Sequence, residues 1–177
     1  MKTNVLVAYV SEYGSTQEVA EAVAATLRDG GFGVDLRPVR KIRSLDGYRA
    51  IVLGAPIYLG AWHKDALGFL EQHREGLQTR PVAVFALGPI QDPTENDWAE
   101  SRAAVQRGLA KSAWLTPIAL GVFGGKFDPA RLRLRDRMIT ILPASPLHNM
   151  PASDLRDWTA IRAWAGNVAA KLQPASI

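Results

Sequence analysis

The residues most suited to binding or catalysis lie at positions 11–16, SEYGST, directly after the apolar run at 5–9. Ser11, Ser15 and Thr16 carry hydroxyls, and Gly14 allows a bound group to approach the backbone. A pattern of helical period follows, and the free N–H groups of a helix's first turn attract anions. This first loop therefore either cradles a dianionic phosphate or is only a capped helix start, with the capping-box pattern Ser15-Thr16-Gln17-Glu18.

The residue types exclude several classes of site. The first loop has no lysine or arginine, so it is neither a nucleotide P-loop nor the dinucleotide fingerprint with its spaced glycines. The chain has no cysteine, which excludes disulfides, iron–sulfur clusters, thiolate zinc sites and cysteine nucleophiles. His73 and His148 have no partner at metal-ligand spacing, so we expect surface histidines and no metal site. Any redox chemistry must come from a bound cofactor.

The elements that position the first loop alternate between short β-branched runs and longer helical patterns, as in a parallel sheet covered by helices. The sequence predicts strands at 4–10, 33–37, 50–54, 81–87 and 117–122. It predicts helices at 16–28, 64–75, 96–111 and 154–172, the last with Ser153 or Asp154 as its N-cap. The predicted fold is a three-layer α/β sandwich with a five-stranded parallel sheet. Residues 124–151, the insertion, follow the fifth strand and have no obvious place in it.

Two further loops follow the third and fourth predicted strands. The second loop, residues 54–63, reads GAPIYLGAWH, and the third loop, residues 87–91, reads LGPIQ. In sheets of this kind, ligands bind beyond the carboxyl ends of the strands, where the winding reverses. A phosphate-type loop beside two loops rich in glycine and apolar or aromatic residues suits a flat ring system with a phosphate tail.

These motifs resemble a known family. The segments SEYGST and GAPIYLG resemble flavodoxin, and the longer stretch GAPIYLGAWHKDALGFLEQH is similar to the menaquinone-dependent protoporphyrinogen oxidase branch of that family. The segments GGKFD, RDRMI and DLRDW extend the resemblance over nearly the whole chain. It implies a flavodoxin-like fold and an FMN cofactor.

The resemblance also implies which residues bind the cofactor. The FMN phosphate would be held by Ser11, Tyr13, Gly14, Ser15 and Thr16. The flavin ring would lie between two sets, namely Pro56, Ile57, Tyr58, Leu59 and Gly60 on one side and Gly88, Pro89, Ile90 and Gln91 on the other. Backbone groups of these loops would tune the reduction potential through hydrogen bonds and burial.

Three side chains near the expected ring have two interpretations each. His63 either donates a hydrogen bond or a proton to a substrate, as a catalytic residue, or stands at a helix start without catalytic duty. Tyr58 and Trp62 either cover the ring or are ordinary core aromatics.

Asp157 and Trp158 are explained by a helix first turn and a buried position.

Residues 131–142 of the insertion, RLRLRDRMITIL, form an amphipathic pattern when drawn as a helix. Leu134, Met138, Ile141 and Leu142 share one stripe, with Arg133, Arg137 and Thr140 opposite. We interpret this segment as a peripheral membrane or substrate-access element. The alternative is that the stripe packs on the protein's own core.

Composition sets the outer bounds. The chain has 177 residues, 47% hydrophobic and 21% charged, which predicts one domain over 1–177. Its formal charge of +4 favours an anionic partner or surface, and we expect no nucleic-acid partner. The N-terminal apolar run is too short for a signal sequence, which indicates a cytoplasmic protein, peripheral to a membrane at most.

Two functions follow. The first is an FMN-dependent oxidoreductase that passes electrons from a reduced substrate, such as a porphyrinogen, to a quinone. The second is a small electron-carrier flavoprotein that docks other proteins and has no organic substrate. FMN is expected rather than FAD, because the first loop suits a terminal phosphate.

Overall fold

The computed structural model describes residues 4–173, and its centre is a parallel sheet of five strands in the order β2-β1-β3-β5-β6. Every neighbouring pair in this order is parallel. The strands are β1 (Asn4–Tyr9), β2 (Gly33–Pro38), β3 (Ala50–Tyr58), β5 (Val82–Leu87) and β6 (Ala119–Phe123). The predicted five-stranded parallel sheet is confirmed, and the winding reverses between β1 and β3.

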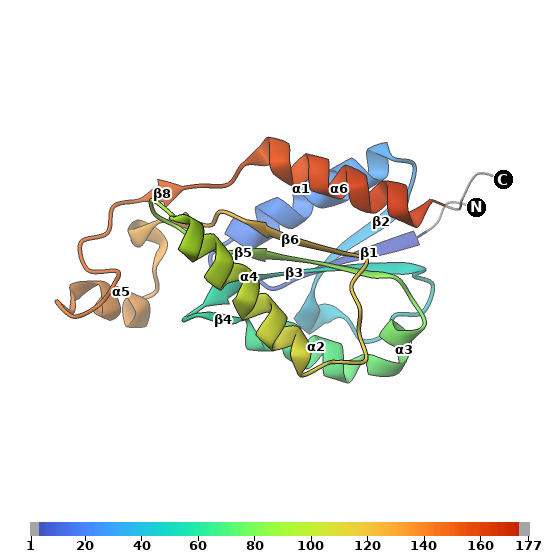
Figure 1. Cartoon of the computed structure of the whole chain (residues 1–177), viewed down its shortest axis with the longest axis horizontal. Coiled ribbons are helices and arrows are strands. Elements are labelled where there is room, and N and C mark those ends of the chain that lie inside the picture. The colour runs from blue at the N-terminus through green and yellow to red at the C-terminus, as the bar shows by residue number, and fades with distance from the viewer. Residues whose placement is uncertain (1–3, 174–177) are drawn as a thin grey trace.

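Helices cover both faces of the sheet, which gives the predicted three layers (Figure 1). One face carries α1 (Ser15–Asp29) and α6 (Trp158–Leu172), and the other carries α2 (Lys64–Gln72), α3 (Arg74–Gln78) and α4 (Glu95–Ala110). A short 3-10 helix, η1 (Val39–Lys41), follows β2. In this part of the chain, residues 4–173, no helix is long and apolar enough to span a bilayer.

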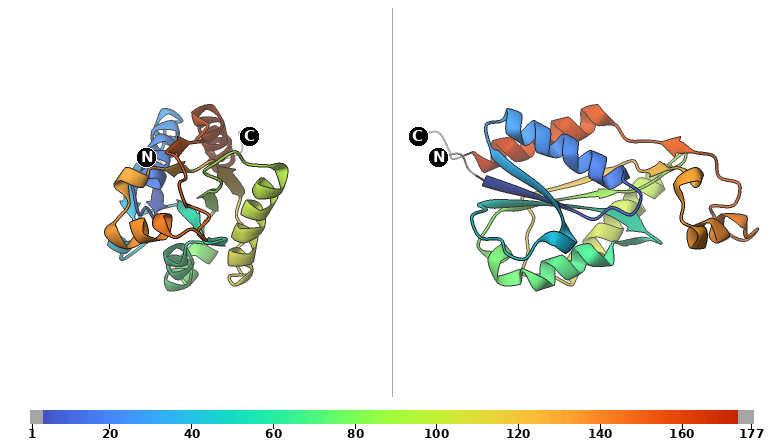
Figure 2. Two further views of the ribbon diagram at one scale, coloured as in Figure 1. Left: turned by 90° about the vertical axis from the view of Figure 1, so that its left-hand side faces the viewer. Right: turned by 180° about the vertical axis from the view of Figure 1, so that it is seen from behind.

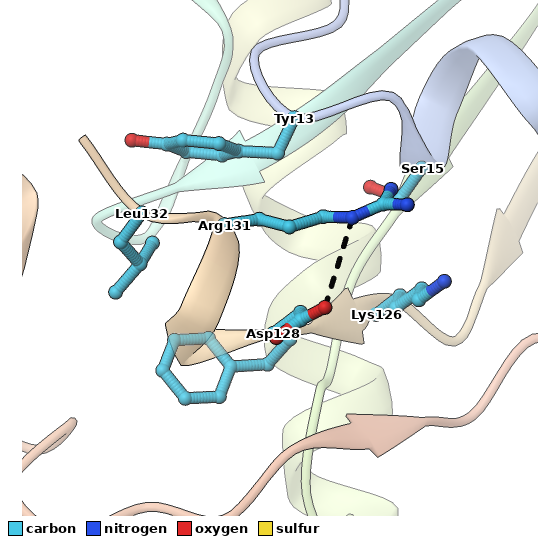
Figure 3. A pocket seen from close by; sticks show the side chains of 7 residues that line it. Tyr13, Ser15, Lys126, Asp128, Arg131 and Leu132 are labelled. Atoms are coloured by element: carbon cyan, nitrogen blue, oxygen red, sulfur yellow. Dashed lines mark ion pairs between the residues drawn. The ribbon is translucent and has the colours of Figure 1, made fainter.

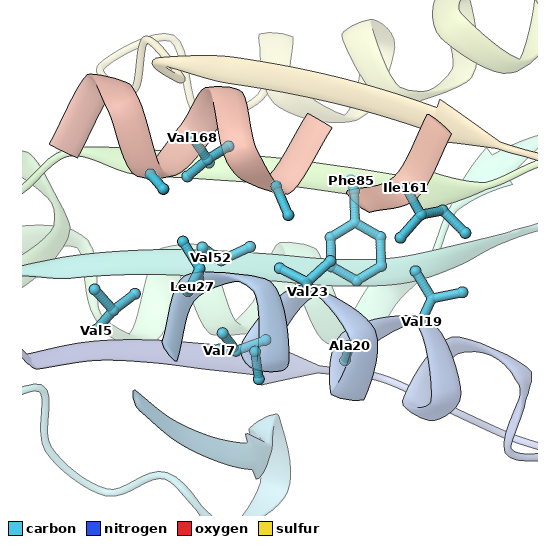
Figure 4. Packing of buried hydrophobic residues seen from close by; sticks show 14 of the residues in the cluster. Val5, Val7, Val19, Ala20, Val23, Leu27, Val52, Phe85, Ile161 and Val168 are labelled. Atoms are coloured by element: carbon cyan, nitrogen blue, oxygen red, sulfur yellow. The ribbon is translucent and has the colours of Figure 1, made fainter. Parts of the chain in front are cut away.

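The core lies on both sides of the sheet because successive strand residues point to opposite faces. Val5 and Val7 of β1 pack under α1 and α6 (Figure 4), whereas Leu6 and Ala8 pack toward α2. Gly54 of β3 is required for this packing, since a Cβ there would lie 2.0 Å from Cζ of Phe85. Two apolar layers thus hold the carboxyl ends of the strands in place.

Three predicted elements differ from the structure. β3 continues to Tyr58 and turns back as β4 (Ala61–Trp62), so much of the second loop is a hairpin. The helix predicted at 64–75 is broken at His73 into α2 and α3. The helix predicted at 154–172 starts only at Trp158 with Asp157 as its N-cap, because Ser153 and Asp154 pair as a strand.

The insertion forms a small unit beyond the carboxyl ends of the strands (Figures 1 and 2). It contains β7 (Lys126–Phe127), the 3-10 helix η2 (Pro129–Arg131) and α5 (Leu134–Ile141). β7 pairs antiparallel with β8 (Ser153–Asp154), which lies just after the insertion. No residue of α5 is buried, so the alternative that its stripe packs on the core is wrong.

Candidate functional site

Three loops meet at the carboxyl edge of the sheet, where β1, β3 and β5 end side by side. The first loop is tied to β3 by a backbone hydrogen bond, in which Val10 N–H donates to the Gly54 carbonyl at 2.9 Å. The third loop is tied to β6 by Gly88 N–H, which donates to the Phe123 carbonyl at 2.8 Å. The loops that the sequence singled out therefore share one edge.

The first loop leaves several of its hydrogen-bond donors without a partner. Gly14 is the N-cap of α1 in the left-handed conformation, with φ of 91°, and no side chain caps this helix, so the capping-box interpretation of Ser15 is wrong. Ser11 Oγ accepts from Gly14 N–H at 3.0 Å. Among the described residues, the N–H groups of Ser15 and Thr16 and the Thr16 hydroxyl have no hydrogen-bond partner. This donor set suits an anion.

The hairpin of the second loop exposes an apolar tip. Leu59 and Gly60 both have positive φ, at 50° and 72°, as a tight two-residue turn requires. Tyr58 is 50% exposed and Leu59 is 89% exposed, so both side chains are accessible to a ligand. Trp62 is buried instead, and its Nε1–H donates to the Ala55 carbonyl at 3.2 Å, so Trp62 is a core aromatic.

An open cleft of about 340 Å³ lies between the second and third loops, and we call it the ring cleft. It brings together Ile57 and Gly60 with the predicted residues Gly88, Pro89, Ile90 and Gln91. Asp97, Glu100, Ser101 and Ala104 of α4 and Met150 of the insertion complete its lining. Pro56, Tyr58 and Leu59 flank the cleft on β3 and its turn without lining it.

His63 lies outside the lining of the ring cleft. It caps α2, because its Nδ1 accepts from Asp65 N–H at 3.1 Å. That bond places the proton of a neutral His63 on Nε2, which lies 3.4 Å from Glu12 Oε1. His63 therefore joins the second loop to the first.

The other two histidines are not free surface groups. His73 packs against Phe69 with ring centroids 4.7 Å apart and ring planes tilted by 49°, and desolvation by burial lowers the pKa of His73. His148 lies 3.1 Å from the Thr140 carbonyl through Nδ1.

The insertion and β8, which follows it, contact the first and third loops, which the sequence did not indicate. The Tyr13 hydroxyl donates to Asp136, and Arg133 Nη1 lies 3.7 Å from Glu12 Oε2. The Ser153 hydroxyl donates to the Ile90 carbonyl in the third loop. The phenol of Tyr13 is thereby engaged by α5, which leaves its backbone and ring to face a ligand.

Arg156 is a further residue that sequence reasoning missed. Its side chain is 3% exposed and bonds Asp154 through Nε and Nη2 at 2.8 and 2.6 Å. Its Nη1 reaches Glu18 Oε2 at 2.5 Å and the Ser15 carbonyl at 3.3 Å. The hydrogen bonds from Arg156 hold the pKa of Asp154 below its ordinary value, and Asp154 and Glu18 raise that of Arg156. Arg156 thus ties β8 to the first turn of α1.

Known proteins with similar sequences include two quinone-linked dehydrogenases. The chain is 26% identical over 141 residues to protoporphyrinogen IX dehydrogenase (quinone) of Escherichia coli strain K12, covering 78% of this chain and 76% of that protein. It is 30% identical over 92 residues to an NAD(P)H dehydrogenase (quinone) of Afipia carboxidovorans, covering 40% and 46%.

Solved structures with the same fold include two flavodoxins. A flavodoxin of Streptococcus pneumonia TIGR4 superposes with a TM-score of 0.60 at 17% identity, covering 96% of this chain and all (100%) of that one. A short-chain flavodoxin associated with a bacterial microcompartment gives 0.60 at 17% identity, covering 97% and 99%. The flavodoxin domain family itself matches residues 6–145. The chain therefore belongs to the flavodoxin domain family.

Proposed function

We propose that this protein binds FMN and acts as an oxidoreductase that passes electrons from a reduced organic substrate to a quinone. Family membership indicates flavin binding. The observation that carries the finer proposal is the pairing of two features on one edge of the sheet. A donor-rich first loop lies at one end, and the ring cleft between the second and third loops lies at the other.

The residues of the first loop fit a terminal phosphate. Ser11, Ser15 and Thr16 offer hydroxyls, and the first turn of α1 offers N–H groups that no described residue uses. Gly14, with nothing within 4 Å of an added Cβ, leaves open space at the helix start. The first loop leads into the single helix α1 and lacks the spaced glycines of a pyrophosphate site, which favours FMN over FAD.

The ring cleft fits a flat, partly apolar group. Ile57 and Ile90 face it from two loops, and Met150 closes one side. Bound flavin would supply the electron-accepting and electron-donating chemistry. The residues that line the ring cleft would bind and orient that ring.

The substrate assignment rests on the relatives. Two of them are named as quinone-linked dehydrogenases, and the one that matches most of the chain is named for protoporphyrinogen IX. We extend a quinone acceptor and a porphyrinogen-like donor to this chain as a proposal. A proton-transfer role for His63 stays a prediction, since both of its ring nitrogens face protein groups.

The test has two stages. Titration of purified protein with FMN, FAD and riboflavin should give the tightest binding for FMN. Anaerobic mixing of the FMN-loaded protein with protoporphyrinogen IX should bleach the flavin absorbance, and menadione should restore it. Reduction by dithionite but not by the porphyrinogen would favour the electron carrier instead. Equal affinity for FMN and riboflavin would remove the phosphate assignment.

We also propose that α5 contacts an anionic membrane surface. Its exposed apolar residues are Leu134, Met138, Ile139 and Ile141, followed by Leu142, with exposed fractions between 37% and 81%. The exposed side chains of Arg131, Arg133, Arg135 and Arg137 lie in the same segment. The insertion projects beyond the sheet (Figure 2), so we expect this exposed segment to be accessible to a bilayer. Each arginine near an anionic leaflet contributes about 1 kcal/mol.

Vesicle sedimentation tests this contact. Binding should require anionic lipid, should weaken in salt, and should fall in the double variant Leu134→Ser, Ile141→Ser. Binding should also fall in Arg137→Gln, and Arg102→Gln, which removes one charge from an exposed position of α4, is the matched control for that variant and should change nothing. Binding that ignores both lipid charge and salt, or no binding, removes the membrane role. The cytoplasmic location stays a prediction.

A further inference from the structure

We infer that the insertion supplies the positive charge for the cofactor phosphate, through Lys126 and Arg131. This inference rests on the proposed binding of FMN. The first loop contains no basic residue, so its own donors are neutral. A phosphate monoester carries a charge near −2 at neutral pH, which hydroxyl and N–H groups solvate without neutralising.

The two cations and the first loop line one cavity, which we call the basic pocket. It is small, with a volume of about 40 Å³. Tyr13 and Ser15 line it from the first loop, and Lys126, Phe127, Asp128, Arg131 and Leu132 line it from the insertion. Figure 3 shows the Arg131 side chain extending toward Ser15, with Lys126 below them. The insertion therefore places two basic side chains beside the residue that begins α1.

The antiparallel pair of β7 and β8 holds Lys126 beside α1. Lys126 pairs with Asp154 across β7 and β8. Arg156 ties that pair of strands to α1 through Glu18 and the Ser15 carbonyl. Gly125 N–H donates to the Pro89 carbonyl at 2.7 Å, and Leu155 N–H donates to the Gly125 carbonyl at 3.0 Å. These contacts fix the backbone of Lys126 relative to the first turn of α1. Only the Lys126 side chain then has to become ordered when a ligand binds.

Arg131 is positioned by its neighbours. Asp128 caps η2 by accepting from Ala130 N–H at 3.0 Å, and its other oxygen lies 3.7 Å from Arg131 Nε. Just beyond, Arg133 and Asp136 contact Glu12 and Tyr13. The segment that carries Arg131 thus contacts the first loop through Arg133 and Asp136, and Asp128 contacts the Arg131 side chain itself.

Lys126 and Arg131 are less neutralised by nearby carboxylates than the other basic residues around the first loop, so they are available to a ligand. Arg156 is bonded to Asp154 and Glu18, and Arg133 is paired with Glu12. Within residues 4–173, no carboxylate oxygen lies within 4.0 Å of the Lys126 ammonium. Arg131 has one carboxylate at 3.7 Å, and its side chain is 57% exposed. Two cations and one carboxylate, Asp128, line the basic pocket, which leaves it positive beside the helix dipole of α1.

The consequence is that Lys126 and Arg131 select the phosphorylated flavin. They attract the phosphate and do not act on the ring, so they should strengthen FMN binding and leave riboflavin binding unchanged. Because both cations are in contact with solvent, the effect should weaken with salt.

The experiment compares FMN and riboflavin affinities in matched variants. Lys126→Gln and Arg131→Gln should each raise the FMN Kd by about three- to tenfold and leave the riboflavin Kd within about twofold. Arg135→Gln removes the same charge from the same insertion but lies outside the basic pocket, so its FMN Kd should equal that of the unmodified protein. Lys126→Arg, which keeps the charge, should stay near the unmodified value.

The outcomes separate this inference from the proposed function. If the unmodified protein binds FMN no better than riboflavin, the phosphate assignment itself fails. If it prefers FMN but Lys126→Gln and Arg131→Gln bind FMN as tightly as Arg135→Gln does, the role of the insertion is overturned. Should a variant fail to fold, the unmodified protein decides the matter. Its preference for FMN over riboflavin should fall between low and high salt, and a preference that ignores salt refutes the inference.

Discussion

Replacing Arg156 by methionine should lower the free energy of unfolding by about 2–4 kcal/mol. Arg156 makes three charge-assisted hydrogen bonds of 2.5–2.8 Å to Glu18 and Asp154, and its side chain is 3% exposed. Each such bond contributes about 1.5–3 kcal/mol when buried. Both carboxylates are 41% exposed, so water competes for them and we take roughly half of that sum. Methionine keeps the apolar stem and removes the bonds.

The acid dependence gives a second readout. The pKa of Asp154 is lowered in the folded protein, chiefly by the hydrogen bond from Arg156. A group with a lowered folded pKa stabilises the protein above its unfolded pKa, about 3.9 for aspartate, and loses that contribution as pH falls through the folded value. The difference in unfolding free energy between the unmodified protein and Arg156→Met should therefore be full near neutral pH and shrink in acid, below about pH 4.

Urea denaturation followed by tryptophan fluorescence measures both effects. Arg162→Met, an exposed arginine of α6, is the matched control and should change the unfolding free energy by less than about 0.5 kcal/mol. Equal losses in the two variants, or a difference that does not shrink in acid, would refute the reasoning.

Three further predictions concern single side chains. Thr16→Val, which removes a hydroxyl with no described partner from the first turn of α1, should weaken FMN binding by about 1–3 kcal/mol and leave riboflavin binding unchanged in a fluorescence titration. An added Cβ at Gly124 would lie 2.1 Å from the Leu155 carbonyl oxygen, so Gly124→Ala should lower the free energy of unfolding by about 3 kcal/mol or more in urea denaturation. Gly166→Ala in α6, where an added Cβ meets open space, should raise the free energy of unfolding by about 0.5–1 kcal/mol. Trp62→Phe removes the bond to the Ala55 carbonyl and should cost about 1–2 kcal/mol in urea denaturation, and a variant as stable as the unmodified protein would contradict the buried bond.

The sequence predicted the fold and the first loop because both depend on local patterns. Apolar runs of strand length and amphipathic helical stretches specify α/β layers, and the order of elements then places three loops at one edge. The ring cleft duly joins Ile57 and Gly60 to the third loop, as the order of strands requires. The roles of the individual cofactor-binding residues stay predictions.

Only the tertiary structure decided where locally ambiguous residues lie. Asp154 looked like a helix cap, yet its pairing with Lys126 and its bonds to Arg156 draw it into a strand, and α6 starts later at Asp157. The stripe of α5 had two interpretations because amphipathicity specifies an apolar face without specifying what covers it. The contacts of Tyr13 with Asp136 and of Glu18 with Arg156 join residues 123 and 138 positions apart. No periodicity or short motif encodes such pairs, since they exist only after the sheet has brought the insertion to the first loop.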